Sequence, residues 1–145
     1  MASPGWVAVA MDTVTPARRS QIMRKVRSKD STAEWTVRRL VFGMGYRYRL
    51  HQATLPGKPD LVFSGRRKVI FVNGCFWHGH DACIRARLPK TNLDYWARKI
   101  ERNVRRDKKT LDALCEAGWR SLVIWECELR ELTAVSARIR EFLDA

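Results

Sequence analysis

The feature of this sequence that most constrains its fold is a set of cysteine and histidine residues divided between two distant segments. Cys75, His80 and Cys83 lie close together, and Cys127 directly follows the apolar segment 121–125. Thiolate sulfur and imidazole nitrogen form closed tetrahedral zinc sites with bonds of about 2.0–2.3 Å. We therefore expect a structural zinc ion that holds the loop around residues 75–83 against the end of the strand preceding Cys127.

Sequence alone leaves other interpretations of these residues open. Asp81 and His78 are competing metal ligands, and the thiols could instead be buried free cysteines or disulfide partners. The N-terminal segment lacks the basic start of a secretory signal, so we expect a reducing compartment, where thiols more often bind metal or fill a core. We expect Cys115 to lie in the core, because it falls on the apolar stripe of a predicted helix.

The hydrophobic pattern predicts two helices, three strands, a helix, a strand and a final helix. Thr15 and Pro16 begin a helix that runs to about Arg27, and Ser31 with Glu34 has the capping-box spacing of a second helix. A long helix is predicted over 92–117, with Asp107 on the same inward side as its apolar residues, and an amphipathic helix carries residues 135–143. Strands are predicted at 46–50 (half-buried), 60–63, 68–72 and 121–125 (buried on both faces).

This order of elements predicts an α/β fold with a mixed central β-sheet flanked by helices. A chain of 145 residues suits one hydrophobic core. We expect a single domain over residues 15–145, preceded by a flexible N-terminal extension, residues 1–14. No apolar run is long enough to span a membrane, so we expect a cytoplasmic protein.

The charge of the chain points to a polyanionic partner. Its formal net charge is +13, from 28 basic and 15 acidic residues, with dense basic segments at 18–29 and 98–109. Lysine and arginine side chains that contact phosphates release condensed counterions, which favours binding. Nucleic acid is the partner we expect, although charge alone would also fit anionic phospholipid.

A candidate active site begins at Asp60, which follows Pro59 and opens a predicted strand joined by a hairpin to the next one. This is the beginning of the PD-(D/E)-x-K nuclease pattern, whose acidic groups hold Mg²⁺. The second strand, residues 69–73, lacks the usual acid-x-lysine. Because Mg²⁺ retains several waters and needs few protein oxygens, a backbone carbonyl is expected to complete its ligands.

His78 is expected to replace the missing lysine. Histidine side chains titrate near neutral pH and can accept a proton from water that attacks a phosphodiester, while metal stabilises the developing charge. Asp107 is expected to orient the imidazole, and Glu34 is a second acid available near the metal. The alternative for each of these two acids is an ordinary ion pair with an arginine.

Two segments carry a specific resemblance to a known family. Residues 56–60 read PGKPD and residues 70–80 read IFVNGCFWHGH, with further similarity at 19–23, 96–107 and 118–127. The chain resembles the very-short-patch repair (Vsr) endonucleases, which have a nuclease fold related to type II restriction enzymes. Members of that family cut 5′ of the thymine in a T·G mismatch, which arises when 5-methylcytosine deaminates.

The resemblance implies residue roles. Asp60 and the Val72 carbonyl would hold Mg²⁺, and His78 would be the general base, supported by Asp107 and Glu34. The implied zinc ligands are Cys75, His80, Cys83 and Cys127. The implied side chains that insert beside the mismatch or contact DNA are Met23, Arg24, Asn73, Phe76, Trp77 and Trp96. A mismatched step costs less to unstack, although the alternative for the aromatic residues is ordinary core packing.

The resemblance also implies a substrate, double-stranded DNA containing a T·G mismatch, and therefore a protein associated with the nucleoid. Mismatch-repair proteins are candidate partners, and a monomer is expected because an asymmetric lesion has no twofold symmetry for a dimer to match. The chain departs from the family pattern at Asn73, where a histidine is common, and at Gly79 and Asp81, where a histidine-rich run is replaced with one extra residue. Its N-terminus is extended and its C-terminus is short.

Three other functions compete with mismatch nicking. The first is a sequence-specific restriction or nicking endonuclease that acts on matched duplex. The second is a zinc-stabilised DNA-binding module without catalysis. The third is an RNA-binding protein that stacks bases on its aromatic side chains, which would leave Asp60 and His78 without a role.

Overall fold

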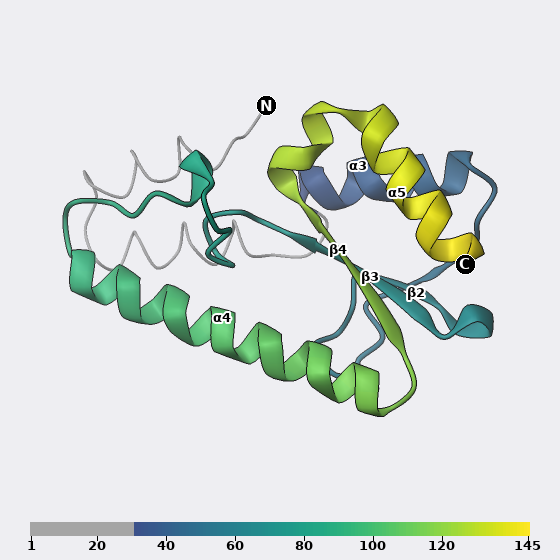
Figure 1. Ribbon diagram of the computed structural model, residues 1–145, viewed down its shortest axis with the longest axis horizontal. Helices are drawn as coiled ribbons and strands as arrows, with labels where there is room; N and C mark the ends of the chain where they lie inside the picture. Colours follow the sequence, from purple (N-terminus) through teal and green to yellow (C-terminus); the bar gives the residue numbers. More distant parts are fainter. Residues whose placement is uncertain (1–30) are drawn as a thin grey trace.

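The computed structural model describes residues 31–145, so the predicted extension 1–14, the predicted helix 15–27, Met23 and Arg24 lie outside the described residues. Within the described residues, helices and strands follow one another in the predicted order (Figure 1). The elements in chain order are α3 (Thr32–Gly43), β1 (Arg49–Leu50), β2 (Leu61–Phe63), β3 (Lys68–Asn73), α4 (Leu93–Glu116), β4 (Arg120–Trp125) and α5 (Leu132–Asp144). Short 3₁₀ turns are η1 (Ser64–Arg66), η2 (Ile84–Ala86) and η3 (Glu126–Arg130).

The strands form a mixed sheet, as the sequence predicted. Its order is β1-β2-β3-β4, with β1, β2 and β3 antiparallel to one another in turn and β4 parallel to β3. The antiparallel pair β2–β3 is joined by the short turn through η1. The parallel pair β3–β4 needs a long crossover connection, which contains α4.

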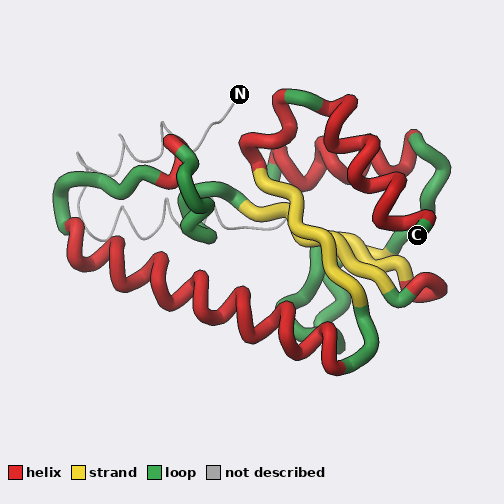
Figure 2. Tube along the Cα trace, viewed as in Figure 1, coloured by secondary structure: helices red, strands yellow, loops and turns green. Residues whose placement is uncertain are grey.

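Helices cover both faces of this sheet. In Figures 1 and 2, α3 and α5 lie on one face, whereas α4 lies on the other. The core between the sheet and α3 and α5 comprises Val37, Val41, Leu61, Phe63, Ile70, Ile124, Val135, Ile139 and Leu143. A smaller core toward α4 comprises Val62, Val69 and Leu114. Neighbouring residues in β2 and β3 thus alternate between the cores, as the period of two in a strand requires.

The start of α3 follows the predicted capping. Ser31 has an extended backbone, and its hydroxyl accepts a hydrogen bond from the backbone N–H of Glu34 at 3.2 Å. This bond satisfies one of the donors that a helix N-terminus leaves without an intrahelical partner. Capping fixes the first turn of α3, in which the Glu34 side chain is buried.

Two predictions about the strands were partly wrong. Only Arg49 and Leu50 of the predicted strand 46–50 pair with β2, and Leu50 is exposed. The predicted strand 121–125 is not buried on both faces, since only Ile124 in β4 is buried. In the described part of the chain β4 is an edge strand beside β3, so its apolar run lacks the neighbours that would bury it completely.

The inward face of α4 also differs from the predicted stripe. Val104 is 43% exposed and Cys115 is exposed, so the prediction that Cys115 lies in the core was wrong. Asn103 is buried instead, and its side-chain amide donates to the Trp77 carbonyl at 2.9 Å. A buried carbonyl needs a hydrogen-bond donor, which explains a polar residue on the inward face. Among residues 31–145, the helices include none long and apolar enough to cross a membrane.

Candidate functional site

The candidate residues gather at one end of the sheet. Strands β3 and β4 are parallel and end together, with Asn73 opposite Trp125, and the 74–91 loop and η3 follow them. Asp60 immediately precedes β2, which is antiparallel to β3. The start of β2 therefore lies beside the end of β3, and residues distant in sequence meet there.

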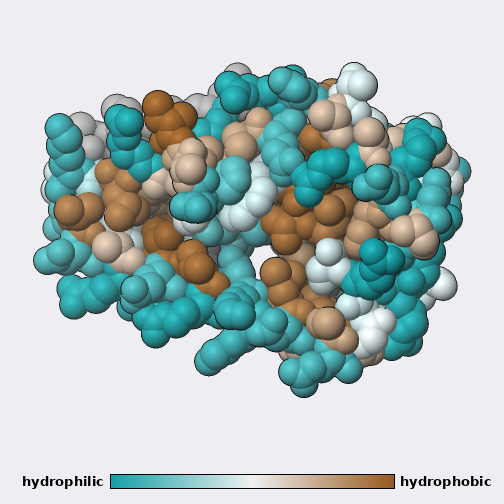
Figure 3. Space-filling model, viewed as in Figure 1, coloured by the Kyte–Doolittle hydropathy of each residue, from teal (hydrophilic) through white to brown (hydrophobic). Residues whose placement is uncertain are grey.

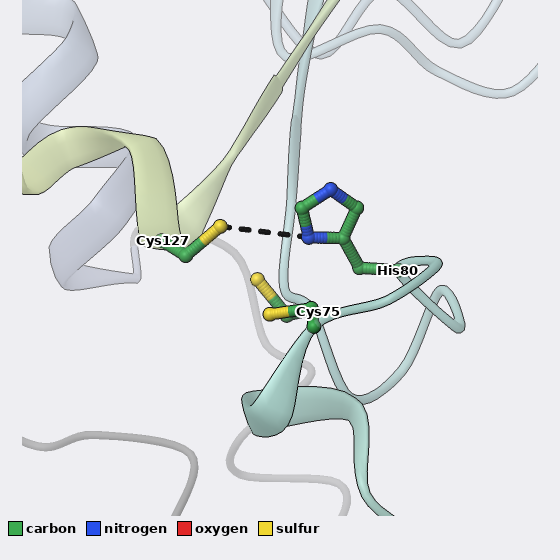
Figure 4. Close-up of side chains that lie close together, drawn as sticks. Cys75, His80 and Cys127 are labelled. Atoms are coloured by element: carbon green, nitrogen blue, oxygen red, sulfur yellow. Dashed lines mark hydrogen bonds between the residues drawn. The ribbon is translucent and has the colours of Figure 1, made fainter.

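The four predicted zinc ligands form one cluster. The ligand atoms of Cys75, His80, Cys83 and Cys127 all lie within 4.8 Å of one another. The Cys127 Sγ atom is 3.5 Å from His80 Nδ1, and the two side chains point toward each other (Figure 4). Tetrahedral bonds to zinc place ligand atoms roughly 3.5–4 Å apart. These residues could therefore hold a metal ion, and the cluster contains neither of the competing candidates, Asp81 and His78.

Local contacts fix the ligands of this cluster. The His80 ring stacks on Trp125 with centroids 4.1 Å apart and an interplanar angle of 9°. The backbone N–H of His80 donates to the backbone carbonyl of Cys75 at 3.0 Å. Burial raises the pKa of the Cys75 thiol to about 12. A bound cation has to displace that proton, so metal affinity should fall as the pH falls.

A second cluster joins Asp60, Glu34 and His51, whose ligand atoms also lie within 4.8 Å of one another. The Val72 N–H donates to Asp60 Oδ2 at 2.7 Å. His51 Nε2 is 3.3 Å from Glu34 Oε1, and His51 Nδ1 is 3.8 Å from Asp60 Oδ1. The arrangement places two carboxylates and an imidazole where a divalent cation could bind.

His51 is the residue of this cluster that sequence analysis missed. It follows the short strand β1, has a left-handed backbone with a φ of 46°, and belongs to no motif with Asp60 or Glu34. No spacing signal could have selected it. It becomes a candidate only because β1 pairs with β2 and so brings position 51 toward Asp60.

The alternative role of Glu34, an ion pair with an arginine, is also present. Arg38 is buried, and its Nη2 atom donates to Glu34 Oε1 at 3.3 Å. The same Nη2 atom lies 3.1 Å from His51 Nε2. Glu34 therefore both pairs with Arg38 and takes part in the cluster, and Arg38 offsets part of its negative charge.

His78 pairs with Asp107, as expected, with Nδ1 and Oδ2 2.5 Å apart. An ionised carboxylate only accepts hydrogen bonds, so we assign the proton to Nδ1, which leaves Nε2 with a lone pair. Both side chains are about one-third exposed or less, at 27% and 30%. This geometry lets an imidazole that is held by a carboxylate accept a proton from water.

Close packing of the loop on α4 positions His78. A Cβ atom at Gly79, whose φ is 58°, would lie 2.8 Å from Ile100 Cγ2 and 3.0 Å from Val104 Cγ2. Only glycine fits such a close approach with a left-handed backbone. Together with the bond from Asn103 to the Trp77 carbonyl, this contact holds the backbone on both sides of His78 against α4.

The aromatic residues predicted to contact DNA pack against one another. Phe76, Trp77 and Trp96 are 3%, 7% and 1% exposed, and their rings meet edge to face at centroid distances of 5.2–6.1 Å. Asn73 is also buried. In this conformation the aromatic residues form a small core between the loop and α4, and their insertion into DNA stays a prediction.

The outer face of α4 carries much of the basic charge. Figure 3 shows mainly hydrophilic side chains along the edge of the molecule where α4 runs. Some of the basic groups pair along the helix, as in Arg105–Glu101 and Lys108–Asp112. The exposed basic residues of α4 are Arg98, Arg102, Arg105, Arg106, Lys108 and Lys109. This face is suited to a polyanion.

Replacing Asp60 with asparagine should stabilise the protein in buffer without Mg²⁺. Burial, reinforced by Glu34 and opposed by the Val72 N–H, raises the pKa of Asp60 from 3.8 to about 7. A carboxyl group whose pKa is higher in the folded than in the unfolded protein contributes its full stabilisation below the unfolded-state pKa. This contribution is lost as the pH rises through the folded-state pKa. At pH 8 we expect the free energy of unfolding of Asp60→Asn to exceed that of the wild type by on the order of 2 kcal/mol. Its unfolding temperature should then be several degrees higher.

The difference in thermal unfolding temperature should shrink at pH 5, where wild-type Asp60 is largely protonated. The measurement is calorimetry or circular dichroism at both pH values, without a metal chelator. Glu101→Gln, at an exposed position of α4, is the matched control and should show no such pH dependence. An equal difference at pH 5 and pH 8 would contradict the explanation.

Comparisons with known proteins identify the family of the chain. The family model for DNA mismatch endonuclease Vsr matches residues 11–84. The chain is 52% identical over 133 residues to type II nicking enzyme V.XorIIP of Xanthomonas oryzae pv. oryzae, covering 92% of this chain and 97% of that protein. It is 40% identical over 137 residues to DNA mismatch endonuclease Vsr of Escherichia coli, covering 91% and 87%.

A third relative has similar coverage. Type II nicking enzyme V.NmeAIP of Neisseria meningitidis is 40% identical over 138 residues, covering 92% of this chain and 98% of the relative. The match therefore extends through the segments that carry Asp60, His78 and the cysteine cluster. The chain belongs to the DNA mismatch endonuclease Vsr family, and it is a DNA endonuclease.

Proposed function

We propose that this protein is a metal-dependent endonuclease that nicks one strand of duplex DNA 5′ of the thymine in a T·G mismatch. The nick would initiate very-short-patch repair of deaminated 5-methylcytosine. The observation that carries the proposal is the pairing of His78, in the loop that follows β3, with Asp107 of α4. The same strand β3 donates its Val72 N–H to Asp60. The names of the relatives, a mismatch endonuclease and nicking enzymes, support it.

Asp60 and the Val72 carbonyl are the proposed ligands of a catalytic Mg²⁺. A residue in an extended strand directs its N–H and its carbonyl to the same side, so the Val72 carbonyl leaves β3 on the side of Asp60. Buried carboxylate oxygens fit a hard divalent cation. When bound, the ion would stabilise the negative charge that develops on the phosphate and on the leaving oxygen.

His78 is the proposed general base. Water attacks phosphorus, a new P–O bond forms, and the bond from phosphorus to the 3′ oxygen breaks. The Nε2 atom of His78 takes the proton of the attacking water, while Asp107 holds Nδ1–H and stabilises the imidazolium that results. The exposed basic face of α4 is proposed to contact the DNA backbone, since such contacts supply affinity without reading sequence.

The remaining parts of the proposal concern recognition and fold. Insertion of Phe76, Trp77 or Trp96 beside the mismatch requires their buried cluster to open. A mismatched DNA step costs less to unstack than a matched one, which would favour insertion there. Met23, Arg24 and Asn73 are the further proposed DNA contacts. The cysteine cluster is proposed to bind zinc. The mixed sheet, with Asp60 directly before the β2–β3 hairpin, supports a restriction-endonuclease-like fold. We propose that the protein acts as a monomer.

A strand-specific nicking assay with Mg²⁺ tests this function. The substrates are a T·G duplex and its matched T·A and C·G versions in several flanking sequences. We expect nicking 5′ of the thymine at a rate at least ~100-fold above that of the matched duplexes, and no nicking by Asp60→Asn. Each tenfold in rate corresponds to about 1.4 kcal/mol of discrimination.

The assay also separates the alternatives. Equal nicking of a matched duplex would replace the proposal with a sequence-specific nicking enzyme, a possibility that the names of several relatives favour. Tight duplex binding without cleavage in any context would instead indicate a non-catalytic DNA-binding module.

A further inference from the structure

We infer that His51 is a ligand of the catalytic metal ion and that its ring nitrogen makes this site prefer Mn²⁺ to Mg²⁺. The inference rests on the proposed function, because it concerns the same ion that Asp60 would hold. It goes beyond that function by adding a nitrogen ligand to a site otherwise made of oxygen atoms. The protein has three histidines; His80 lies in the cysteine cluster and His78 pairs with Asp107, so His51 is the one in the Asp60 cluster.

The separation of His51 and Asp60 suits two ligands of one ion. Their Nδ1 and Oδ1 atoms are 3.8 Å apart. This exceeds the distance of a hydrogen bond, about 2.7–3.2 Å. With bonds of about 2.1 Å, two ligand atoms of a six-coordinate ion lie roughly 3–4 Å apart. The ring edge that carries Nδ1 therefore faces Asp60 at the spacing of a shared cation.

The opposite edge of the imidazole has the partner that metal-binding histidines commonly use. His51 Nε2 lies 3.3 Å from Glu34 Oε1. A ligating histidine usually donates its second N–H to a carboxylate, which fixes the ring and its tautomer. Arg38 Nη2 lies 3.1 Å from His51 Nε2, and both are donors when Nε2 carries the proton. Arg38 Nη2 can donate to Glu34 Oε1 instead, which lies 3.3 Å away.

Burial and charge favour a cation at this position. The side chains of His51, Glu34 and Asp60 are only 13%, 10% and 16% exposed. Carboxylates that are shielded from water need compensation from a nearby cation. A divalent cation between Asp60 and His51 would provide it, with Glu34 as the outer partner of the histidine.

The nitrogen ligand determines the metal preference. Mg²⁺ binds oxygen ligands almost exclusively, whereas imidazole binds transition metals well. Mn²⁺ accepts carboxylate, carbonyl and imidazole ligands together. A site built from Asp60, the Val72 carbonyl and His51 should therefore bind Mn²⁺ at least tenfold more tightly than Mg²⁺.

Electron paramagnetic resonance of Mn²⁺ tests the assignment directly. The probe is Mn²⁺ added to the full-length, zinc-loaded protein without DNA; free Mn²⁺ is quantified from its signal, and ¹⁴N coupling to bound Mn²⁺ is recorded by pulsed methods. We expect ¹⁴N coupling in the wild type. We expect its loss in His51→Gln, with Mn²⁺ affinity at least tenfold weaker and Mg²⁺ affinity changed less than threefold.

Matched variants separate this role from a structural one. Arg49→Gln changes an exposed residue of the same segment and should bind Mn²⁺ as the wild type does, with the same ¹⁴N coupling. Thermal unfolding establishes that His51→Gln is folded. Should that variant not fold, His51→Asn replaces it, and the ¹⁴N measurement on the wild type still stands by itself.

The outcomes distinguish this inference from the proposed function. Mn²⁺ binding that is lost in Asp60→Asn but shows no ¹⁴N coupling in the wild type, or keeps the coupling in the His51 variant, overturns the ligand role and leaves the proposed function intact. Absence of Asp60-dependent Mn²⁺ binding overturns the metal site that both share. Mismatch nicking by the wild type, measured separately, tests the proposed function whatever His51 does.

Discussion

His78→Ala should reduce the rate of strand nicking by at least ~10³-fold while the protein stays folded and binds duplex DNA. A positioned general base contributes about 10²–10⁴-fold to such a reaction. The His78 side chain is about one-quarter exposed and contacts Asp107, so its truncation should leave the core unchanged. The measurement is single-turnover cleavage of the T·G duplex at saturating enzyme, which separates chemistry from binding.

Asp107→Asn tests the same pair from its other member and should lower the single-turnover rate by about 10²-fold or more. An amide can donate to Nδ1 and so stabilise the tautomer in which Nε2 carries the proton and cannot accept another. Asp112→Asn, which alters an exposed acid of the same helix that pairs with Lys108, is the matched control and should cleave at the wild-type rate. A His78→Ala rate within tenfold of the wild type would assign the base to another group.

Loss of the cysteine cluster should have the second large effect, on both stability and cleavage. We expect Cys127→Ser to release the bound zinc, to lower the unfolding temperature by more than 10 °C and to reduce nicking to background. Binding of structural zinc contributes on the order of 10 kcal/mol to folding in small zinc domains. Here the cluster ties the loop that begins after β3 to η3 after β4, and this loop carries His78.

Zinc content by mass spectrometry and thermal unfolding check this prediction together. Cys115→Ser is the matched control, since Cys115 is exposed on α4 and lies outside the cluster. It should retain zinc, unfolding temperature and activity. A Cys127→Ser protein that keeps its zinc and its unfolding temperature would show that the cluster is not a structural metal site.

The amino-acid sequence by itself determined the parts of this protein that depend on local spacing. The capping hydroxyl of Ser31, the β2–β3 hairpin and the long helix α4 were all predictable because hydrogen bonds and apolar periodicity within a segment define them. The grouping of Cys75, His80 and Cys83 was predictable for the same reason. Cys127 joined them because it follows β4, and parallel strands end at a common edge.

Only the tertiary structure decided which neighbours each side chain meets. Asn103 replaced Val104 on the inward face of α4 because the Trp77 carbonyl of a distant loop required a donor. Cys115 became exposed, and β4 became an edge strand of the described sheet, because burial depends on which elements pack there. His51 met Asp60 and Glu34 through the pairing of β1 with β2. Such contacts join residues far apart in the chain, and no periodicity within one segment encodes them.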